Sequence, residues 1–470
     1  MPSTSIAEHL LHLLAAVPFE EKQRHTWSSL ALFLLPIPLL VLQLHLLVRY
    51  DPLRTLPLRL ALVPAIALLS LPAAFHRYFD LDGSGQVRGQ AQHFNFGAGV
   101  YSIYAIVRSV EWGTQCSRPR LKRAPGVASA PAIDASPEKT TTTPGKSHRR
   151  QRGDNNGVGD DTPTLPILFP GTWTPIELDL LQNMRGVGWE SGTPLSAPAL
   201  PVPRYRYVDR LRWAARRLPN LIVTYTCLDA LAVVIRDQRV FPHIATVPGT
   251  SIWTAPPGLF GSALGPYILT ATFGTMIYLV IQSHHALLSI LMVLLLRDLP
   301  SRWDPLPFDA PLFATSVQDL WSNRWHHLFR QSFLHVAYSP VRTVAAAVVG
   351  RKAARALATF AVFALSALVH EWGQLPMSPH SRLGITQTGT FFLVQAVAIV
   401  LEHAWRDVTG TKVRGLPGWI WTFAFLIYTG TMPTDEWTRR GLPLSWVFTP
   451  KYTRPFVDWA VDVAQRRFGR

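Results

Sequence analysis

The sequence has few charged residues and few cysteines for its length. Charged side chains make up 16% of its 470 residues, well below the ~25% of ordinary soluble domains. The two cysteines, Cys116 and Cys227, cannot build a disulfide framework or a four-cysteine metal site. The sequence also lacks a Gly-x-Ser-x-Gly elbow, a P-loop and a Gly-x-Gly-x-x-Gly fingerprint. It therefore carries none of the common signatures of α/β hydrolases and nucleotide-binding folds.

Histidine pairs are present, but their spacing does not suit a metal. His284-His285 and His326-His327 lack the His-x₃₋₄-His and His-x₂₋₃-His-His boxes of membrane di-iron enzymes. We therefore expect no metal and no bound cofactor.

Apolar residues dominate the composition of the chain. The chain is 48% hydrophobic and contains 16 Trp and 23 Phe, with a mean hydropathy of +0.15. This composition predicts an all-α integral membrane protein with several spans. The net charge of +16 lies mostly in loops between apolar segments, which is typical of cytoplasmic loops and of surfaces facing anionic lipid. With no zinc finger or RNP motif, nucleic acid is not an expected partner.

The apolar segments predict a helical bundle with about eight or nine membrane segments and a buried catalytic cavity. Two of the predicted spans are 259–281 and 286–296. The polar-aromatic segment 166–218, which contains a basic cluster at 204–217, is interpreted as interfacial. Three regions follow from the pattern. Residues 1–112 hold the N-terminal membrane segments, 113–165 form a disordered, basic, cytoplasmic loop, and 166–470 form the core.

His370 is the most informative single residue. The charge-free run 356–369 precedes it, and a helix from Arg355 to about Leu375 would be ~20 residues, or ~30 Å, long. An ionisable side chain at that depth is costly and usually faces a functional cavity. The alternative is an interfacial histidine bonded to a backbone carbonyl. Ser366, one helical turn earlier, could orient the imidazole or bond its own helix carbonyl.

Residues 316–330 concentrate Trp and His between membrane segments. If this stretch is helical, His326 and Arg330 share one face, as do Ser322 and His326. The alternative interpretation is an interfacial amphipathic helix with a tryptophan belt. That alternative explains the tryptophans better than it explains two histidines beside Asn323.

The two segments together resemble the wax synthase branch of the membrane-bound O-acyltransferases. In that branch a Ser-x-x-x-Phe-Trp-x-Arg-Arg-Trp-His segment precedes a membrane-embedded histidine. Here Ser316 to His326 is the first element, with Leu320 and Asn323 replacing Phe and the first Arg, and Ser366-Ala-Leu-Val-His370-Glu371 follows about 45 residues later. Two N-terminal stretches are similar to fungal members, namely 95–112 and Arg185-Gly-Val-Gly-Trp189.

The resemblance implies acyl transfer from acyl-CoA, with acetyl-CoA expected, to an alcohol in a membrane cavity. It implies that residues 166–470 are an acyltransferase core and that His370 is the base. Asn323, His326 or a Trp indole would stabilise the oxyanion, and Arg324 and Arg330 could meet the phosphates of CoA. Trp321, Trp325 and Ser366 complete the predicted substrate and CoA site. Fungal relatives suggest a terpenoid or meroterpenoid acceptor and the endoplasmic reticulum.

Three alternatives stay open at this point. A long-chain fatty alcohol as acceptor would make the protein a wax ester synthase. A proton-coupled transporter would use His370 as a proton relay, but it predicts linked charges on several helices and internal repeats, and the sequence shows neither. An inactive membrane scaffold would have had no need of both His370 and His326.

Overall fold

The computed structural model describes residues 23–79, 92–121, 165–168, 172–190, 192, 206–247, 249–377, 384–445 and 452–468. Most of the predicted 113–165 loop lies outside these residues. The regular elements of the described residues are helices, apart from one parallel pair of two-residue strands, β1 (Gln23–Arg24) and β2 (Arg77–Tyr78). The longer helices are α2 (Pro36–Arg49), α3 (Leu56–Phe75), α4 (Gln92–Thr114), α6 (Tyr207–Arg236), α7 (Gly261–Leu295), α11 (Ser339–Gln374), α12 (Gln387–Thr409), α13 (Gly415–Arg439) and α14 (Arg454–Phe468).

Short helical elements fill the connections between the long helices, and most of them surround the predicted site. They are η2 (Ser28–Leu34), α5 (Ile176–Gln182), α8 (Pro300–Trp303), η3 (Pro311–Phe313), α9 (Val317–Asp319), η4 (Leu320–Arg324), α10 (Arg330–Phe333), η5 (Leu334–Tyr338), η6 (Leu375–Met377) and η7 (Leu442–Ser445).

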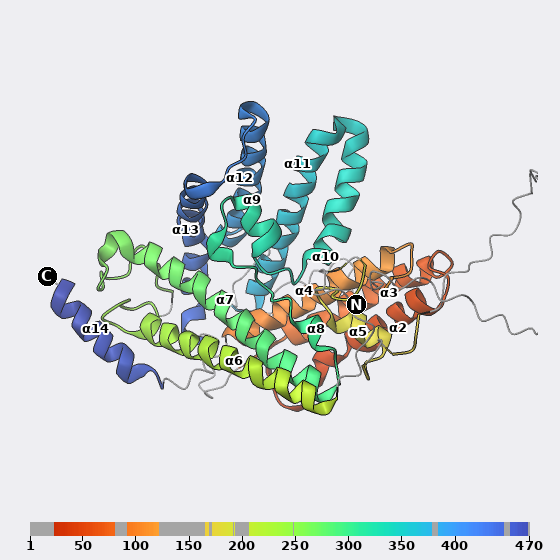
Figure 1. Ribbon diagram of the computed structural model, residues 1–470, viewed down its shortest axis with the longest axis horizontal. Coiled ribbons are helices and arrows are strands. Elements are labelled where there is room, and N and C mark those ends of the chain that lie inside the picture. Colours follow the sequence, from red (N-terminus) through yellow and green to blue (C-terminus); the bar gives the residue numbers. More distant parts are fainter. Residues whose placement is uncertain are drawn as a thin grey trace, which may run out of the picture.

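The long helices form three groups (Figure 1). Helices α6 and α7 pack along each other on one side, and α11, α12 and α13 stand across them. Helices α2, α3 and α5 gather at the end where the chain begins. Helix α4 lies between the groups, because it packs against α2 and α3 as well as α11. It therefore joins the N-terminal helices to the part of the fold that carries His370.

Five helical segments of the described chain are long and apolar enough to cross a membrane. They are Ser28–Arg49, Tyr207–Arg236, Gly261–Leu295, Arg330–Met377 and Gln387–Thr409, and Leu56–Pro72 is a shorter apolar helix. The predicted all-α, membrane-integral class is confirmed. The count of eight or nine segments and the buried cavity stay predictions.

One predicted boundary is wrong. The separate spans 259–281 and 286–296 are one continuous helix, α7, because Gln282-Ser-His-His285 contains neither Gly nor Pro and its backbone bonds continue through it. The basic stretch at 204–217 forms, from Tyr207 on, the first part of α6, and its interfacial location stays a prediction.

Helix α11 reverses direction at Gly350. This residue has φ +79° and ψ 166°, a conformation that only glycine adopts without strain. The two halves form a hairpin (Figure 1), and Val336 of η5 lies in the same apolar cluster as Leu365 and Val369 of the returning half. The returning half, which ends at Gln374, is the His370 helix that the sequence predicts.

Candidate active site

The His370 ring is held by the backbone of its own helix. Its Nδ1 atom lies 2.7 Å from the carbonyl oxygen of Ser366, and because a carbonyl can only accept, Nδ1 is the donor. In the neutral ring Nε2 then carries the lone pair. No other hydrogen bond reaches this ring from the described residues. The Ser366 carbonyl, one turn earlier, therefore orients the imidazole and leaves Nε2 available as a base.

Aromatic rings surround His370. Its ring centroid lies 4.2 Å from that of Phe392 on α12 and 6.4 Å from that of Phe96 on α4. The residue is partly buried between these helices. His284 makes the same bond to a carbonyl four residues earlier, but it is exposed on α7. The bond to a backbone carbonyl therefore does not distinguish His370 from His284. The aromatic rings around His370 do.

His326 is the second imidazole of the site. Its ring centroid lies 5.8 Å from Phe308, 5.8 Å from Trp325 and 6.4 Å from Phe329. Its Nδ1 atom is buried and has no hydrogen-bond partner in the described part of the chain. Burial, and then the nearby His370 and His327 imidazoles, lower the pKa of His326 to about 3. His326 is therefore neutral at physiological pH, and it lies close enough to His370 to interact with it electrostatically.

The segment that carries His326 is not a regular helix, which corrects one expectation. Ser316 caps α9 by accepting a 2.9 Å bond from the Asp319 amide. The chain then widens into the π-turn η4 and becomes extended at Trp325, whose ψ is 151°. His326 and Arg330 therefore do not share a helical face, and neither do Ser322 and His326. A π-turn inside a helix frequently marks a functional site.

Asn323 and Arg324 turn toward Asp319. The Asn323 amide, which is exposed, donates to Asp319 Oδ1 at 3.1 Å, and Arg324 Nε donates to Oδ2 at 2.6 Å. Burial opposes ionisation of Asp319, but these bonds hold its pKa below the usual value. No contact joins Asn323 to either histidine among the described residues. The structure thus brings His326 and His370 together but gives Asn323 and Arg324 an internal partner, and their predicted roles stay predictions.

The predicted tryptophans lie beside the histidines. Trp321 stacks edge-on against Trp325 and Phe363, with ring centroids 5.9 Å apart in both pairs. The Trp321 indole donates to Gln395 Oε1 at 3.2 Å. Arg330 is exposed at the start of α10. Trp321 and Trp325 therefore form a wall of the site, with the Trp321 indole already bonded.

Helix α12 holds both halves of the site in register. Near its C-terminal end Glu402 accepts bonds from the backbone amides of Val317 and Gln318 at 2.7 and 2.9 Å. Gln395, two turns earlier, holds Trp321. The sequence prediction missed both residues. Their signal was present, since a Glu and a Gln inside an apolar helix are costly unless they have a task.

Glu371 fixes the other end of α12. Its Oε1 atom accepts from the Thr386 amide, the Thr386 hydroxyl and the Gly389 amide at 2.9, 2.7 and 2.7 Å. The carboxylate therefore caps the N-terminus of α12 and does not pair with the neighbouring imidazole. This anchor sets Phe392, one turn into α12, against His370.

The family comparison falls on this same region. Residues 303–394 match the family model described as "Membrane bound O-acyl transferase family". The matched range begins at the end of α8 and ends inside α12, and so contains His326, the α11 hairpin and His370.

Curated relatives come from plants and fungi. The probable long-chain-alcohol O-fatty-acyltransferase 7 of Arabidopsis thaliana is 29% identical over 182 residues, covering 38% of this chain and 48% of the relative. An acetyltransferase of Rhodocybe pseudopiperita is 27% identical over 263 residues, covering 53% and 63%. An acetyltransferase of Arthrobotrys oligospora is 23% identical over 302 residues, covering 57% and 58%.

The chain spans about half to two thirds of the length of these relatives. The family match and the names of the relatives agree with the resemblance carried by the two histidine segments. The region that carries the two histidine segments is therefore similar to membrane-bound O-acyltransferases, and the relatives of this chain include long-chain-alcohol O-fatty-acyltransferases of plants and acetyltransferases of fungi.

Proposed function

We propose that this protein is a membrane O-acyltransferase that moves an acyl group from acyl-CoA to a hydroxyl of a lipophilic acceptor. One observation carries the proposal. The Ser366 carbonyl accepts a hydrogen bond from Nδ1–H of His370, so that Nε2 is left as a base near a second, neutral imidazole. The family match over the same residues supports this choice.

The chemistry needs a base because an alcohol is a weak nucleophile. His370 Nε2 would accept the hydroxyl proton while the alcohol oxygen attacks the thioester carbonyl, which forms a tetrahedral oxyanion. When this intermediate collapses, the C–S bond breaks and the CoA thiolate leaves, taking up the proton held by His370. General base catalysis of this kind contributes ~10²–10⁴ in rate.

The oxyanion needs a hydrogen-bond donor, and we assign that role to His326. A neutral imidazole has one N–H, and apolar rings surround it, so its bond to a developing charge is strong. Two of the other predicted donors are engaged, since Asn323 is bonded to Asp319 and the Trp321 indole to Gln395.

For the finer assignment we propose acetyl transfer to a terpenoid or meroterpenoid alcohol of secondary metabolism, in the endoplasmic reticulum. The names of the two fungal relatives, both acetyltransferases, support the acetyl group. The names of the plant relatives favour long-chain alcohols as the second candidate. Apolar pockets separate such substrates by only ~1–3 kcal/mol per methylene.

The test uses microsomes that contain the full chain, labelled acetyl-CoA or palmitoyl-CoA, and a panel of terpenoid and long-chain alcohols. Wild-type microsomes should form an ester, and His370→Gln should lower its rate by about 10²-fold or more. His284→Gln is the matched control, because His284 makes the same helix bond outside the site, and it should keep full rate. Full transfer by His370→Gln would exclude this base. Solute flux with no ester from any alcohol would support a transporter.

A further inference from the structure

Arg185 is a buried cation on the loop that follows α5. The residue is 7% exposed, and its guanidinium donates to the Pro305 carbonyl at 2.6 Å and to His285 Nε2 at 3.1 Å. Neither partner is an anion. Burial lowers the pKa of Arg185 to about 10, so it remains charged at neutral pH. No carboxylate pairs with it among the described residues, although buried charges are normally paired.

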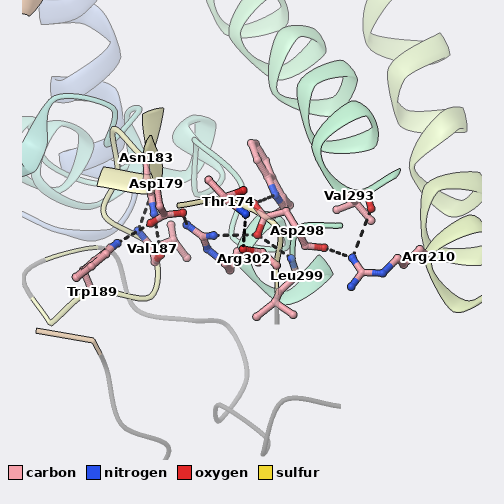
Figure 2. Close-up of polar contacts among 12 residues, drawn as sticks. Thr174, Asp179, Asn183, Val187, Trp189, Arg210, Val293, Asp298, Leu299 and Arg302 are labelled. Carbon is pink, nitrogen blue, oxygen red and sulfur yellow. Dashed lines mark hydrogen bonds and ion pairs between the residues drawn. The ribbon is translucent and has the colours of Figure 1, made fainter. Parts of the chain in front are cut away.

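The carboxylates around this loop are used to hold it in place (Figure 2). Asp179 accepts from the Trp189 indole at 2.8 Å and pairs with Arg302 at 2.6 Å. Arg302 also pairs with Asp298 at 2.8 Å. The acids therefore fix the loop through Trp189 and Arg302 and leave Arg185 with neutral partners.

The loop itself is tightly built. Asn183 and Val187 exchange two hydrogen bonds of 3.0 and 2.9 Å across it. Gly186 has φ +59°, and a Cβ atom there would lie 2.2 Å from Gln331 Oε1 of α10. The Arg185 loop is thus pressed against the segment that follows the His326 motif, so the direction of its guanidinium is set by the fold.

Two further side chains that can donate hydrogen bonds, His327 and Arg330, lie near Arg185. Gln331, the residue after Arg330, faces Gly186, the residue after Arg185. Burial, and then the charges of Arg330 and Arg185, lower the pKa of His327. His327 Nε2 is buried and has no hydrogen-bond partner in the described part. Arg330 is exposed and forms no ion pair among the described residues. Donors from the α5 loop and from 327–330 therefore lie close together. Asp309 is the acid whose charge reaches His327, and no ion pair among the described residues joins it to Arg185 or Arg330.

This cationic site lies a short distance from the histidine pair. On α7, Tyr278 contacts Phe308 with ring centroids 4.8 Å apart, and Phe308 contacts His326. His285, the partner of Arg185, is seven residues after Tyr278 on the same helix, about 10 Å along its axis. A ligand with an anionic head and a distant reactive group could place the head at the cationic site and the reactive group at the histidine pair.

We propose that Arg185, with His327 and Arg330, binds the phosphate groups of the acyl-CoA donor, and that His285 orients the guanidinium. The proposal rests on the acyltransferase function above. It places the phosphate contact on Arg185 in preference to Arg324, whose charge is neutralised by Asp319. A guanidinium suits this task because it offers two parallel N–H donors to a phosphate.

The test compares two donors, acetyl-CoA and S-acetylpantetheine, which carries the same thioester without phosphates. Arg185→Gln should raise the KM for acetyl-CoA about 10- to 100-fold, the loss expected for charged hydrogen bonds, and leave the KM for S-acetylpantetheine unchanged. Arg330→Gln, at an exposed position, should raise the acetyl-CoA KM several-fold. Adenosine 3′,5′-bisphosphate should compete with acetyl-CoA in the wild type and about 10-fold more weakly in Arg185→Gln.

Arg212→Gln is the matched control, because Arg212 is an exposed arginine of α6 paired with Asp209; it should leave both KM values unchanged. If the KM for acetyl-CoA were equal in the wild type, Arg185→Gln and Arg330→Gln, the proposed phosphate site would be wrong. The acyltransferase function would be unaffected by that result. If anionic phospholipid stimulated the wild type but not Arg185→Gln, and the acetyl-CoA KM were the same in both, the site would be assigned to a lipid phosphate instead. No transfer from either donor by the wild type would reject the proposed function itself.

Discussion

At the scale of single residues, the site keeps its imidazoles away from carboxylates. Glu371, next to His370 in sequence, is bonded to the start of α12. Asp319, on the His326 segment, is bonded to Arg324. A free carboxylate beside either ring would favour imidazolium, which cannot act as a base. Engaging both acids elsewhere leaves aromatic surroundings that favour the neutral rings.

His326 should make the protein sensitive to acid. Its pKa is about 3 in the folded protein and about 6.5 in the unfolded chain, so between these values the unfolded state binds more protons and stability falls as pH falls. From pH 7 to pH 5 this group should cost up to about 2 kcal/mol of unfolding free energy. Unfolding in detergent micelles at both pH values should show a smaller loss for His326→Gln than for wild type and for His284→Gln. An equal loss in all three would contradict the low pKa.

At the scale of elements, α12 acts as a spacer between the two histidine segments. Glu402 holds the beginning of α9, Gln395 holds Trp321, and Glu371 of α11 holds the helix start. The helix is rigid, so these anchors fix the separation of the two segments. Glu402 also accepts from the Trp421 indole of α13 at 3.0 Å, which ties a third helix to the same point.

Glu402→Gln should therefore lower the rate of catalysis, although Glu402 does not contact the reacting atoms. The amide cannot accept bonds from both backbone N–H groups and the indole as well as the carboxylate does. We expect kcat to fall about 10-fold while the KM for acetyl-CoA stays within twofold, because misplacing the His326 segment by a fraction of an ångström affects the transition state more than donor binding. Asp407→Asn, at an exposed position of the same helix, is the control and should change neither. An unchanged kcat in Glu402→Gln would refute the spacer role.

At the scale of the whole molecule, buried ion pairs connect the helix groups. Arg302 of α8 joins Asp179 of α5 to Asp298, whose carbonyl accepts from Arg210 of α6 (Figure 2). Arg108 and Glu111 of α4 form a second buried pair at 2.8 Å, which Ser332 of α10 joins. Apolar packing alone is weakly directional, so these pairs fix which helices meet and in what orientation.

Asp179→Ala should lower stability strongly. Removing this carboxylate takes away the ion pair that it forms with the Arg302 guanidinium, which is 6% exposed, and the bond that it accepts from the Trp189 indole. The expected loss is about 3–5 kcal/mol of unfolding free energy, measured as a lower melting temperature in detergent. Lys352→Gln breaks an exposed pair with Asp407 and should leave the melting temperature nearly unchanged. Equal melting temperatures for Asp179→Ala and Lys352→Gln would show that the buried network does not stabilise the fold.

The sequence by itself determined the membrane class, the His370 helix and the two histidine segments, because helix length, hydropathy and residue spacing are local properties. It left open whether His370 acts or only bonds a backbone carbonyl, and the structure shows the carbonyl bond inside an aromatic site. It could not exclude a break within α7, since a short polar run in an apolar segment is compatible with a turn or with a continuous helix.

Only the tertiary structure decided the partners of the polar side chains. Asp319 takes Asn323 and Arg324, Glu402 reaches back 85 residues to Val317, and Arg185 meets His285 from a loop 100 residues away. Such choices depend on which helices pack together and on which donors are left without an anion once the stronger pairs have formed. Because these choices depend on contacts between residues far apart in the sequence, local sequence patterns could not predict them.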